Sequence, residues 1–200
     1  MSRRVRRSRV LATDTAPQRR RIALWAVPLV LGIAAIVVGL DQLAKYLVIE
    51  NLPYGEAVPI LGPVLEFVFV RNSGAAFSLG AGWTWIFALL AVAVAVILIV
   101  FARRIRSKAW AIVFGLLLGG TIGNLIDRLF REPGFGVGHV IDFIQIWGFP
   151  AIFNIADVAI TASMVVFVLL TLIGIGVDGV RRSGKPAGSD PVSGERDGDS

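Results

Sequence analysis

The stretch WTWIFALLAVAVAVILIVFA, residues 83–102, is 20 residues long and contains no charged side chain. That length matches the roughly 20 apolar residues that an α-helix needs to cross the hydrocarbon core of a membrane. Three other stretches have a similar length and are almost as apolar: residues 22–40, 109–126 and 155–177. The sequence therefore predicts an α-helical membrane protein with four transmembrane helices.

The composition supports this fold class. The chain of 200 residues is 56% hydrophobic and has a mean hydropathy of +0.75, a balance that soluble domains of this size seldom reach. Residues 22–40 follow a basic segment, so they could instead be a signal peptide. They are longer than a usual signal-peptide core, and they lead directly into the charged, helix-like stretch DQLAKYLVIE, residues 41–50. We therefore interpret them as an uncleaved first transmembrane helix.

The net charge of +6 arises from basic residues gathered in three places. Eight arginines precede residue 22, four basic residues lie within residues 103–108, and four more lie within residues 181–196. A chain that crosses the membrane four times places all three groups on one side. The positive-inside rule makes that side, with both termini, cytoplasmic. A nucleic-acid-binding arm at the N-terminus is an alternative, but topology explains all three groups at once, so we expect no nucleic-acid partner.

These features predict an Arg-rich cytoplasmic extension (residues 1–21), a four-helix transmembrane domain (residues 22–178) and a disordered cytoplasmic tail (residues 179–200). Residues 64–71 are mainly β-branched or aromatic and precede the turn sequence NSG. They predict a strand, and hence a small extracytoplasmic β-sheet between the first and second helices. The chain has no cysteine and a single histidine, His139. This excludes a disulfide or a cysteine-ligated metal, and no metal site is expected.

Polar residues gather at the predicted outer ends of the helices. Asp41 and Lys45 are four residues apart and can pair on one helix face. Asn154 and Asp157, three residues apart, also share a face. One stripe of the third helix, with Arg128 beside it, contains Gly120, Gly123, Asn124 and Asp127. Because ionisable groups at membrane depth are rare and usually face the interior of a bundle, we expect these helix ends to form one site.

Structural roles for the same residues stand beside this interpretation. Asp41 with Lys45 could be an interfacial ion pair, and Asp127 with Arg128 could cap and orient the third helix. The asparagines could only hydrogen-bond neighbouring helices, and Asn154 could be the N-cap of the fourth helix. The glycines alone are a weak signal, because glycine is frequent in transmembrane helices.

For Asp142 and Asp157 the structural explanation is weaker, since the nearest basic residues in the sequence are Arg128 and Arg131. The topology brings the two together, with Asp142 in the loop that leads back to the membrane and Asp157 where the chain re-enters. Two such carboxyl groups at an apolar interface are expected to share a proton. The ionised group can accept a proton from water, and the protonated group can donate one to a scissile carbonyl and then to the leaving amine. The pair leaves open which residue starts as the base.

Five motifs carry a resemblance to a known family. They are DQLAKY, RNSGAAF, GGTIGNLIDR, HVIDFI and FNIAD, which begin at residues 41, 71, 119, 139 and 153. In this order and with four transmembrane helices, they resemble the lipoprotein signal peptidases (signal peptidase II), which are bacterial membrane aspartyl endopeptidases.

The resemblance implies a reaction and a site. Family members remove signal peptides from diacylglyceryl-modified prolipoproteins, cleaving before the lipidated cysteine, without a metal or organic cofactor. The catalytic residues would be Asp142 and Asp157. The expected substrate-binding and supporting residues are Asn72, Asn124, Arg128, Asn154, Asp127, Asp41, Lys45, Gly120 and Gly123. The expected partners are the prolipoprotein and membrane lipid. The chain would be a monomer in the bacterial cytoplasmic (inner) membrane, with its active site at the outer face.

Two other classes of protein remain open at this point. A transporter or proton-coupled carrier could also use membrane carboxylates, but such proteins usually have broken helices or inverted repeats, and the sequence shows neither. A purely structural membrane protein would not need polar groups at every outer helix end. Proton flux in liposomes would favour the carrier. Retained biological activity after both aspartates become asparagine would favour the structural protein.

Overall fold

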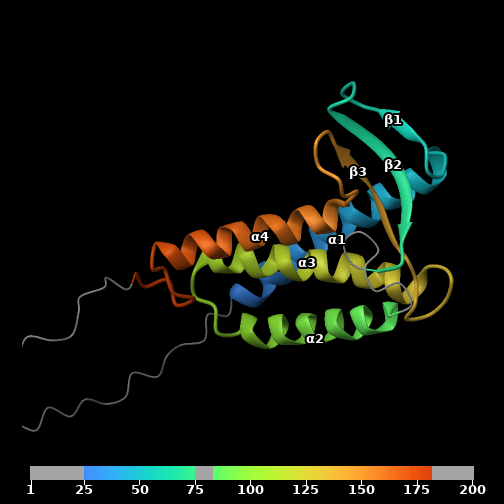
Figure 1. Cartoon of the computed structure of the whole chain (residues 1–200). Helices are drawn as coiled ribbons and strands as arrows, with labels where there is room; N and C mark the ends of the chain where they lie inside the picture. The colour runs from blue at the N-terminus through green and yellow to red at the C-terminus, as the bar shows by residue number, and fades with distance from the viewer. Residues whose placement is uncertain (1–24, 75–82, 182–200) are drawn as a thin grey trace, which may run out of the picture.

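The computed structural model describes residues 25–74 and 83–181. Within them the chain forms four helices and three strands (Figure 1). The elements are α1 (Ala26–Asn51), β1 (Ala57–Pro59), β2 (Leu65–Asn72), α2 (Thr84–Ala102), α3 (Lys108–Phe130), β3 (Val140–Ile146) and α4 (Ile155–Leu172). All four helices are long and apolar enough to cross a membrane, which confirms the predicted fold class. The expectations for residues 1–21 and for most of the polar tail lie outside the described residues.

Two helix boundaries differ from the predicted ones. Helix α1 continues without a break through DQLAKYLVIE to Asn51, so Asp41 and Lys45 lie on the same helix as the first apolar stretch. Helix α4 ends at Leu172, although the apolar sequence continues to residue 177. The chain turns at Gly174, whose φ of 73° suits the left-handed conformation that often ends a helix.

Helix α3 lies at the centre of the bundle and contacts the other three helices. Glycines on its face toward α1 allow the backbones to approach closely. A Cβ atom at Gly119 would lie 2.7 Å from the Cβ of Val37 and 2.9 Å from the carbonyl oxygen of Ala34. Away from the sheet, the helices pack through a purely apolar cluster that includes Val30 and Trp110.

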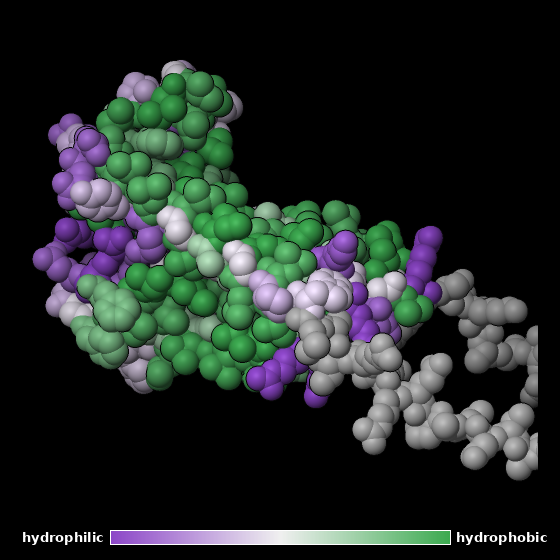
Figure 2. All heavy atoms as spheres, turned by 180° about the vertical axis from the view of Figure 1, so that it is seen from behind, coloured by the Kyte–Doolittle hydropathy of each residue, from purple (hydrophilic) through white to green (hydrophobic). Residues whose placement is uncertain are grey.

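The outer surface of the bundle is apolar. Figure 2 shows hydrophobic residues over the middle of the bundle and hydrophilic residues toward its two ends. On α2, for example, Leu89 is 60% exposed and Ile97 is 55% exposed. Such a surface is stable in lipid, where the helical backbone satisfies its own hydrogen bonds. This chain is a multi-pass membrane protein.

The sheet lies at one end of the bundle and extends to one side of it (Figure 1). Its strands are antiparallel in the order β1-β2-β3. Strand β2 confirms the strand predicted for residues 64–71. The prediction of a sheet confined to the segment between the first two helices was incomplete, because β3 comes from the segment between α3 and α4. Residue Asp142, expected in a loop, lies on β3 opposite Val70.

Strand β3 is also tied to the segment that leads into α4. The backbone N–H groups of Phe143 and Ile144 donate to the carbonyl oxygen of Phe153 at 3.0 and 2.8 Å, and the N–H of Phe153 donates to the carbonyl oxygen of Ile144 at 3.0 Å. These bonds hold Asp142 on β3 close to the start of α4.

Candidate active site

Asp142 and Asp157 are brought together by Asn154. Its Nδ2 donates to Oδ1 of Asp142 at 2.6 Å. Its Oδ1 accepts from the backbone N–H of Asp157 at 3.0 Å, and its own N–H donates to Oδ2 of Asp157 at 3.3 Å. The last two bonds form a capping box at the start of α4, which confirms the predicted N-cap. The same side chain therefore begins the helix and links the two aspartates.

Two further asparagines complete the amide shell around the carboxyl groups. Asn72 on β2 donates to Oδ2 of Asp142 at 2.9 Å, and Asn124 on α3 donates to Oδ1 of Asp157 at 2.8 Å. Asn124 in turn accepts from Nδ2 of Asn154 at 3.1 Å. The three amides thus come from three separate elements and orient both carboxyl groups.

The carboxyl group of Asp142 lies in an environment that favours its protonated form. Only 3% of the residue is exposed, and this burial raises the pKa of Asp142 to about 6, because an ionised carboxylate loses its hydration there. The hydrogen bonds from Asn72 and Asn154 and the positive charge of Lys45 lower this pKa, whereas the negative charge of Asp157 raises it. Asp142 therefore keeps its proton to a higher pH than an ordinary aspartate does.

The two aspartates line a cleft of about 830 Å³ that has one polar and one apolar side. The polar side also contains Asn72, Asn124 and Arg128. The apolar side consists mainly of α4 and the segment before it. Its side chains include Phe149, Ile152, Phe153, Val158, Ala162, Val165 and Val166. The cleft can therefore accept an extended apolar chain and hold a polar backbone group of it against the carboxyl groups.

Arg128 belongs to the cleft and does not pair with Asp127. Its guanidinium donates to the carbonyl oxygens of Gly74 and Asn124, each at 3.2 Å, and lies 5.8 Å from the ring centre of Phe87. Its buried Nε has no hydrogen-bond partner among residues 25–74 and 83–181. The sequence allowed Asp127 and Arg128 to cap and orient α3; in the structure Arg128 does donate to a carbonyl oxygen in the last turns of α3, while Asp127 pairs with Lys45 and Arg131.

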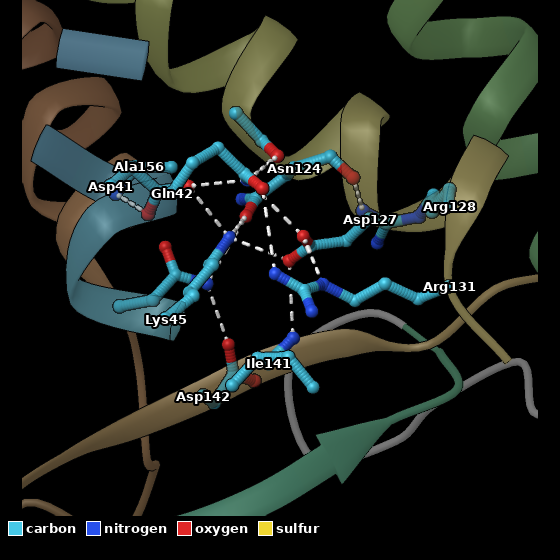
Figure 3. A network of polar contacts seen from close by, with 12 residues as sticks. Asp41, Gln42, Lys45, Asn124, Asp127, Arg128, Arg131, Ile141, Asp142 and Ala156 are labelled. Carbon is cyan, nitrogen blue, oxygen red and sulfur yellow. Dashed lines mark hydrogen bonds and ion pairs between the residues drawn. The ribbon is translucent and has the colours of Figure 1, made fainter. Parts of the chain in front are cut away.

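A buried cluster of charges lies near Asp142 (Figure 3). The Nζ of Lys45 is 2.8 Å from Asp41 and 2.7 Å from Asp127, and all three side chains are fully buried. The predicted pairing of Asp41 with Lys45 is confirmed, and the pair is buried within the bundle. The sequence interpretation missed Arg131, whose Nε is 2.6 Å from Asp127, although its i,i+4 spacing from Asp127 is a usable signal.

Sequence reasoning also missed Gln42, which has no spacing signal across the bundle. Its Nε2 donates to the carbonyl oxygen of Gly123 at 3.0 Å and to Oδ1 of Asp127 at 3.2 Å.

The predicted glycines of α3, Gly120 and Gly123, lie against the neighbouring helices α4 and α1. A Cβ at Gly123 would lie 2.8 Å from Oδ2 of Asp41, and one at Gly120 would overlap the carbonyl oxygen of Ala156 on α4.

Within the described ranges, no group of three or more His, Cys, Asp or Glu side chains is placed to hold a metal ion. The backbone N–H of His139 donates to the carbonyl oxygen of Glu132 at 2.9 Å, outside the amide shell of the aspartates.

Comparison with known proteins agrees with this geometry. A family model described as Signal peptidase (SPase) II matches residues 33–173, which include every residue of the cleft and of the charge cluster. The chain belongs to the signal peptidase II family. Members of this family are aspartic peptidases, so the chain is a membrane-embedded hydrolase.

Similar proteins share most of their length with this chain. A "Lipoprotein signal peptidase" of Leifsonia xyli subsp. xyli is 54% identical over 182 residues, which are 91% of this chain and 84% of the relative. One of Mycobacterium avium is 42% identical over 86% of this chain and 93% of its own length. A solved structure titled "Bacterial membrane enzyme structure by the in meso method at 2.3 A resolution" aligns with a TM-score of 0.67 and 26% identity. That alignment covers 84% of this chain and 98% of the other.

Proposed function

We propose that this chain removes signal peptides from diacylglyceryl-modified prolipoproteins by hydrolysing the peptide bond before the lipidated cysteine, with Asp142 and Asp157 as the catalytic pair. The names of its relatives support a prolipoprotein substrate. The observation that carries the proposal is the placement of two carboxyl groups, linked by one asparagine, at the polar side of a largely apolar cleft.

The chemistry requires one ionised and one protonated carboxyl group. The ionised group takes a proton from a water molecule, whose oxygen attacks the carbonyl carbon of the scissile bond. The protonated group donates to the carbonyl oxygen, and a proton then passes to the leaving amine as the C–N bond breaks. The raised pKa of Asp142, about 6, supports this division, because Asp142 can exist in either form near neutral pH. The proton belongs to the pair, so the starting base is not assigned.

The polar residues of the cleft have complementary roles in this proposal. The amides of Asn72, Asn124 and Asn154 orient the carboxyl groups. Arg128 is assigned the role of holding a carbonyl oxygen of the substrate, because its buried Nε has no hydrogen-bond partner among residues 25–74 and 83–181. The apolar wall on α4 suits a signal peptide, and its position on a transmembrane helix suits a substrate that enters sideways from lipid. The reaction proposed here needs no cofactor.

The same proposal assigns an orientation and a location. The connection between α2 and α3 contains Arg103 and Arg104, and Lys108 begins α3; all three are exposed and lie at the end of the bundle away from the sheet. By the positive-inside rule this end is cytoplasmic, together with residues 1–21 and 179–200. The sheet and the active site then lie at the outer face of the bacterial cytoplasmic membrane. Because the whole site comes from one chain, we expect a monomer in contact with membrane lipid.

A cleavage assay with two matched substrates tests this function. The purified protein, in detergent or lipid, is given a prolipoprotein that carries the diacylglyceryl group and the same precursor without it. Mass spectrometry of the products should show cleavage directly before the modified cysteine and no product from the unmodified precursor. Equal cleavage of both precursors would contradict the lipid requirement, and no cleavage of either would contradict the proposed function.

A further inference from the structure

The backbone just before each aspartate is held by a carboxylate of the buried charge cluster. Asp41 on α1 accepts from the N–H of Ala156, the residue before Asp157, at 2.9 Å. Asp127 on α3 accepts from the N–H of Ile141, the residue before Asp142, at 3.2 Å. The cluster therefore contacts the two segments that carry the proposed catalytic pair, each at the residue next to its aspartate (Figure 3).

A single side chain connects these two contacts. Nζ of Lys45 is 2.8 Å from Oδ2 of Asp41 and 2.7 Å from Oδ2 of Asp127. It also donates to Oδ1 of Asn124 at 3.0 Å, and Asn124 in turn donates to Asp157. An ammonium group has three donors, so these three oxygens use all of them.

We infer that Lys45 is a positioning residue, which sets the placement of Asp142 relative to Asp157 through Asp41, Asp127 and Asn124. This inference rests on the proposed function and adds a residue that does not touch the substrate. Lys45 contributes no atom to the lining of the cleft. It acts through the backbone next to each aspartate and through the amide of Asn124.

Stability alone is a poor explanation for this arrangement. Replacing a buried ion pair by well-packed apolar residues is often neutral or stabilising, so a buried pair is weak evidence for stability. The other end of the bundle packs through apolar side chains such as Val30, Trp110 and Val113. Catalysis, in contrast, depends on placement. A shift of about 1 Å in a reacting group can reduce a rate by about 100-fold.

The positive charge of Lys45 also affects the pKa of Asp142. The charged groups that act on Asp142 are Lys45 from α1, Arg128 from α3 and Asp157 from α4, while β2 contributes the uncharged Asn72. Since the charge of Lys45 lowers the pKa of Asp142, removing that charge raises this pKa further. The pH at which Asp142 ionises therefore moves upward.

The variant Lys45→Met tests the inference, with Val113→Ala as the control for stability. Val113 is buried on α3 in the apolar cluster, so its truncation lowers the Tm without touching the site. For Lys45→Met we expect kcat on the lipidated precursor to fall by about 100-fold. We expect KM to stay within about threefold of wild type, because the cleft lining is intact. The limb of the pH–rate profile that reports the ionisation of Asp142 should move to higher pH. Val113→Ala should change the Tm alone.

A double variant keeps the test decisive if Lys45→Met folds poorly. Without Lys45, Asp127 keeps Arg131 as its partner, whereas Asp41 loses its ion pair. The change Asp41→Asn removes that unpaired charge and can still accept from the N–H of Ala156. We expect Lys45→Met with Asp41→Asn to regain most of the Tm while kcat stays low.

Three outcomes would overturn the inference. They are a folded Lys45→Met variant with the kcat and pH midpoint of wild type, a double variant in which kcat recovers together with the Tm, and a failure of both variants to fold. The last two would assign Lys45 to stability alone. Wild type and Asp142→Asn are measured in parallel. If wild type is inactive or Asp142→Asn is fully active, the proposed function itself fails, and the inference fails with it.

Discussion

At the end of the bundle away from the sheet, the helices meet through apolar side chains such as Ala26, Val30 and Trp110. At the end that carries the sheet, the same helices meet through Lys45, Asp127 and their partners, which are as deeply buried but charged. Burying charge costs free energy that apolar packing does not. The comparison indicates that one end stabilises the bundle and that the other uses part of that stability to hold reactive groups in place. Four predictions test this contrast.

Apart from substitutions of the two aspartates, the substitution expected to lower kcat most is at Asn154, which links them. The change Asn154→Ala removes the N-cap and the link to Asp142, and we expect kcat to fall by about 100-fold, within the range of a lost positioning contact. The Tm should also fall, because a lost cap costs about 1 kcal/mol. Activity and thermal unfolding are measured on the same preparation.

The matched control is Asn154→Ser, which keeps a side-chain oxygen for the N-cap but is too short to reach Asp142. It should retain most of the Tm and still lose activity. A serine variant with the kcat of wild type would show that the link between the aspartates has no catalytic role.

The second prediction concerns how the burial of the Asp142 carboxyl group lowers the free energy of unfolding as the pH rises. Because the pKa of Asp142 is about 6 in the folded protein and near 3.8 when unfolded, the folded state binds the proton more tightly. Stability is therefore lost as the pH rises from about 4 to above 6. The difference of about two pKa units corresponds to about 3 kcal/mol. We expect Asp142→Asn to have a higher Tm than wild type at pH 8 and a similar Tm at pH 4. An equal Tm difference at both pH values would contradict this account.

The third prediction concerns the glycines that bring the helices together near the site. A Cβ at Gly120 would overlap the carbonyl oxygen of Ala156, whereas one at Gly32 on α1 meets no atom within 4 Å. We expect Gly120→Ala to lower stability by about 1–3 kcal/mol, as overpacking does, and Gly32→Ala to leave the Tm nearly unchanged. The Tm of each variant is measured by thermal unfolding in the same detergent. Equal Tm values for the two variants would show that the α3–α4 contact is not tight.

The sequence predicted the apolar end more completely than the charged end. The helices follow from unbroken apolar stretches, and the pairs Asp41–Lys45 and Asn154–Asp157 follow from the spacing of residues on one helix turn. Strand β3 was missed because its pairing with β2 joins residues about 70 positions apart, such as Asn72 and Asp142. Such a partner leaves no local pattern in the sequence.

The charged cluster could be predicted only in part for the same reason. The i,i+4 rule identifies each pair within a helix, but not the contact between Lys45 on α1 and Asp127 on α3. It also cannot show that Asp127 binds Arg131 and that Arg128 turns to the cleft, since both arginines follow Asp127 closely. The direction of a side chain across the bundle depends on helix packing, which becomes visible only in the folded chain.

The most direct test of the catalytic pair compares three Asp→Asn variants in the cleavage assay. Asp142→Asn and Asp157→Asn each keep the size of the side chain but remove its ability to exchange a proton. Asp178, beyond the far end of α4, accepts from the backbone N–H of Val180 at 3.2 Å, does not line the cleft, and serves as the matched control. We expect each of the first two variants to lose at least about 100-fold in kcat, as general acid–base catalysis implies, and Asp178→Asn to match wild type. A folded Asp142→Asn or Asp157→Asn variant with the activity of wild type would contradict the assignment of these residues as the catalytic pair.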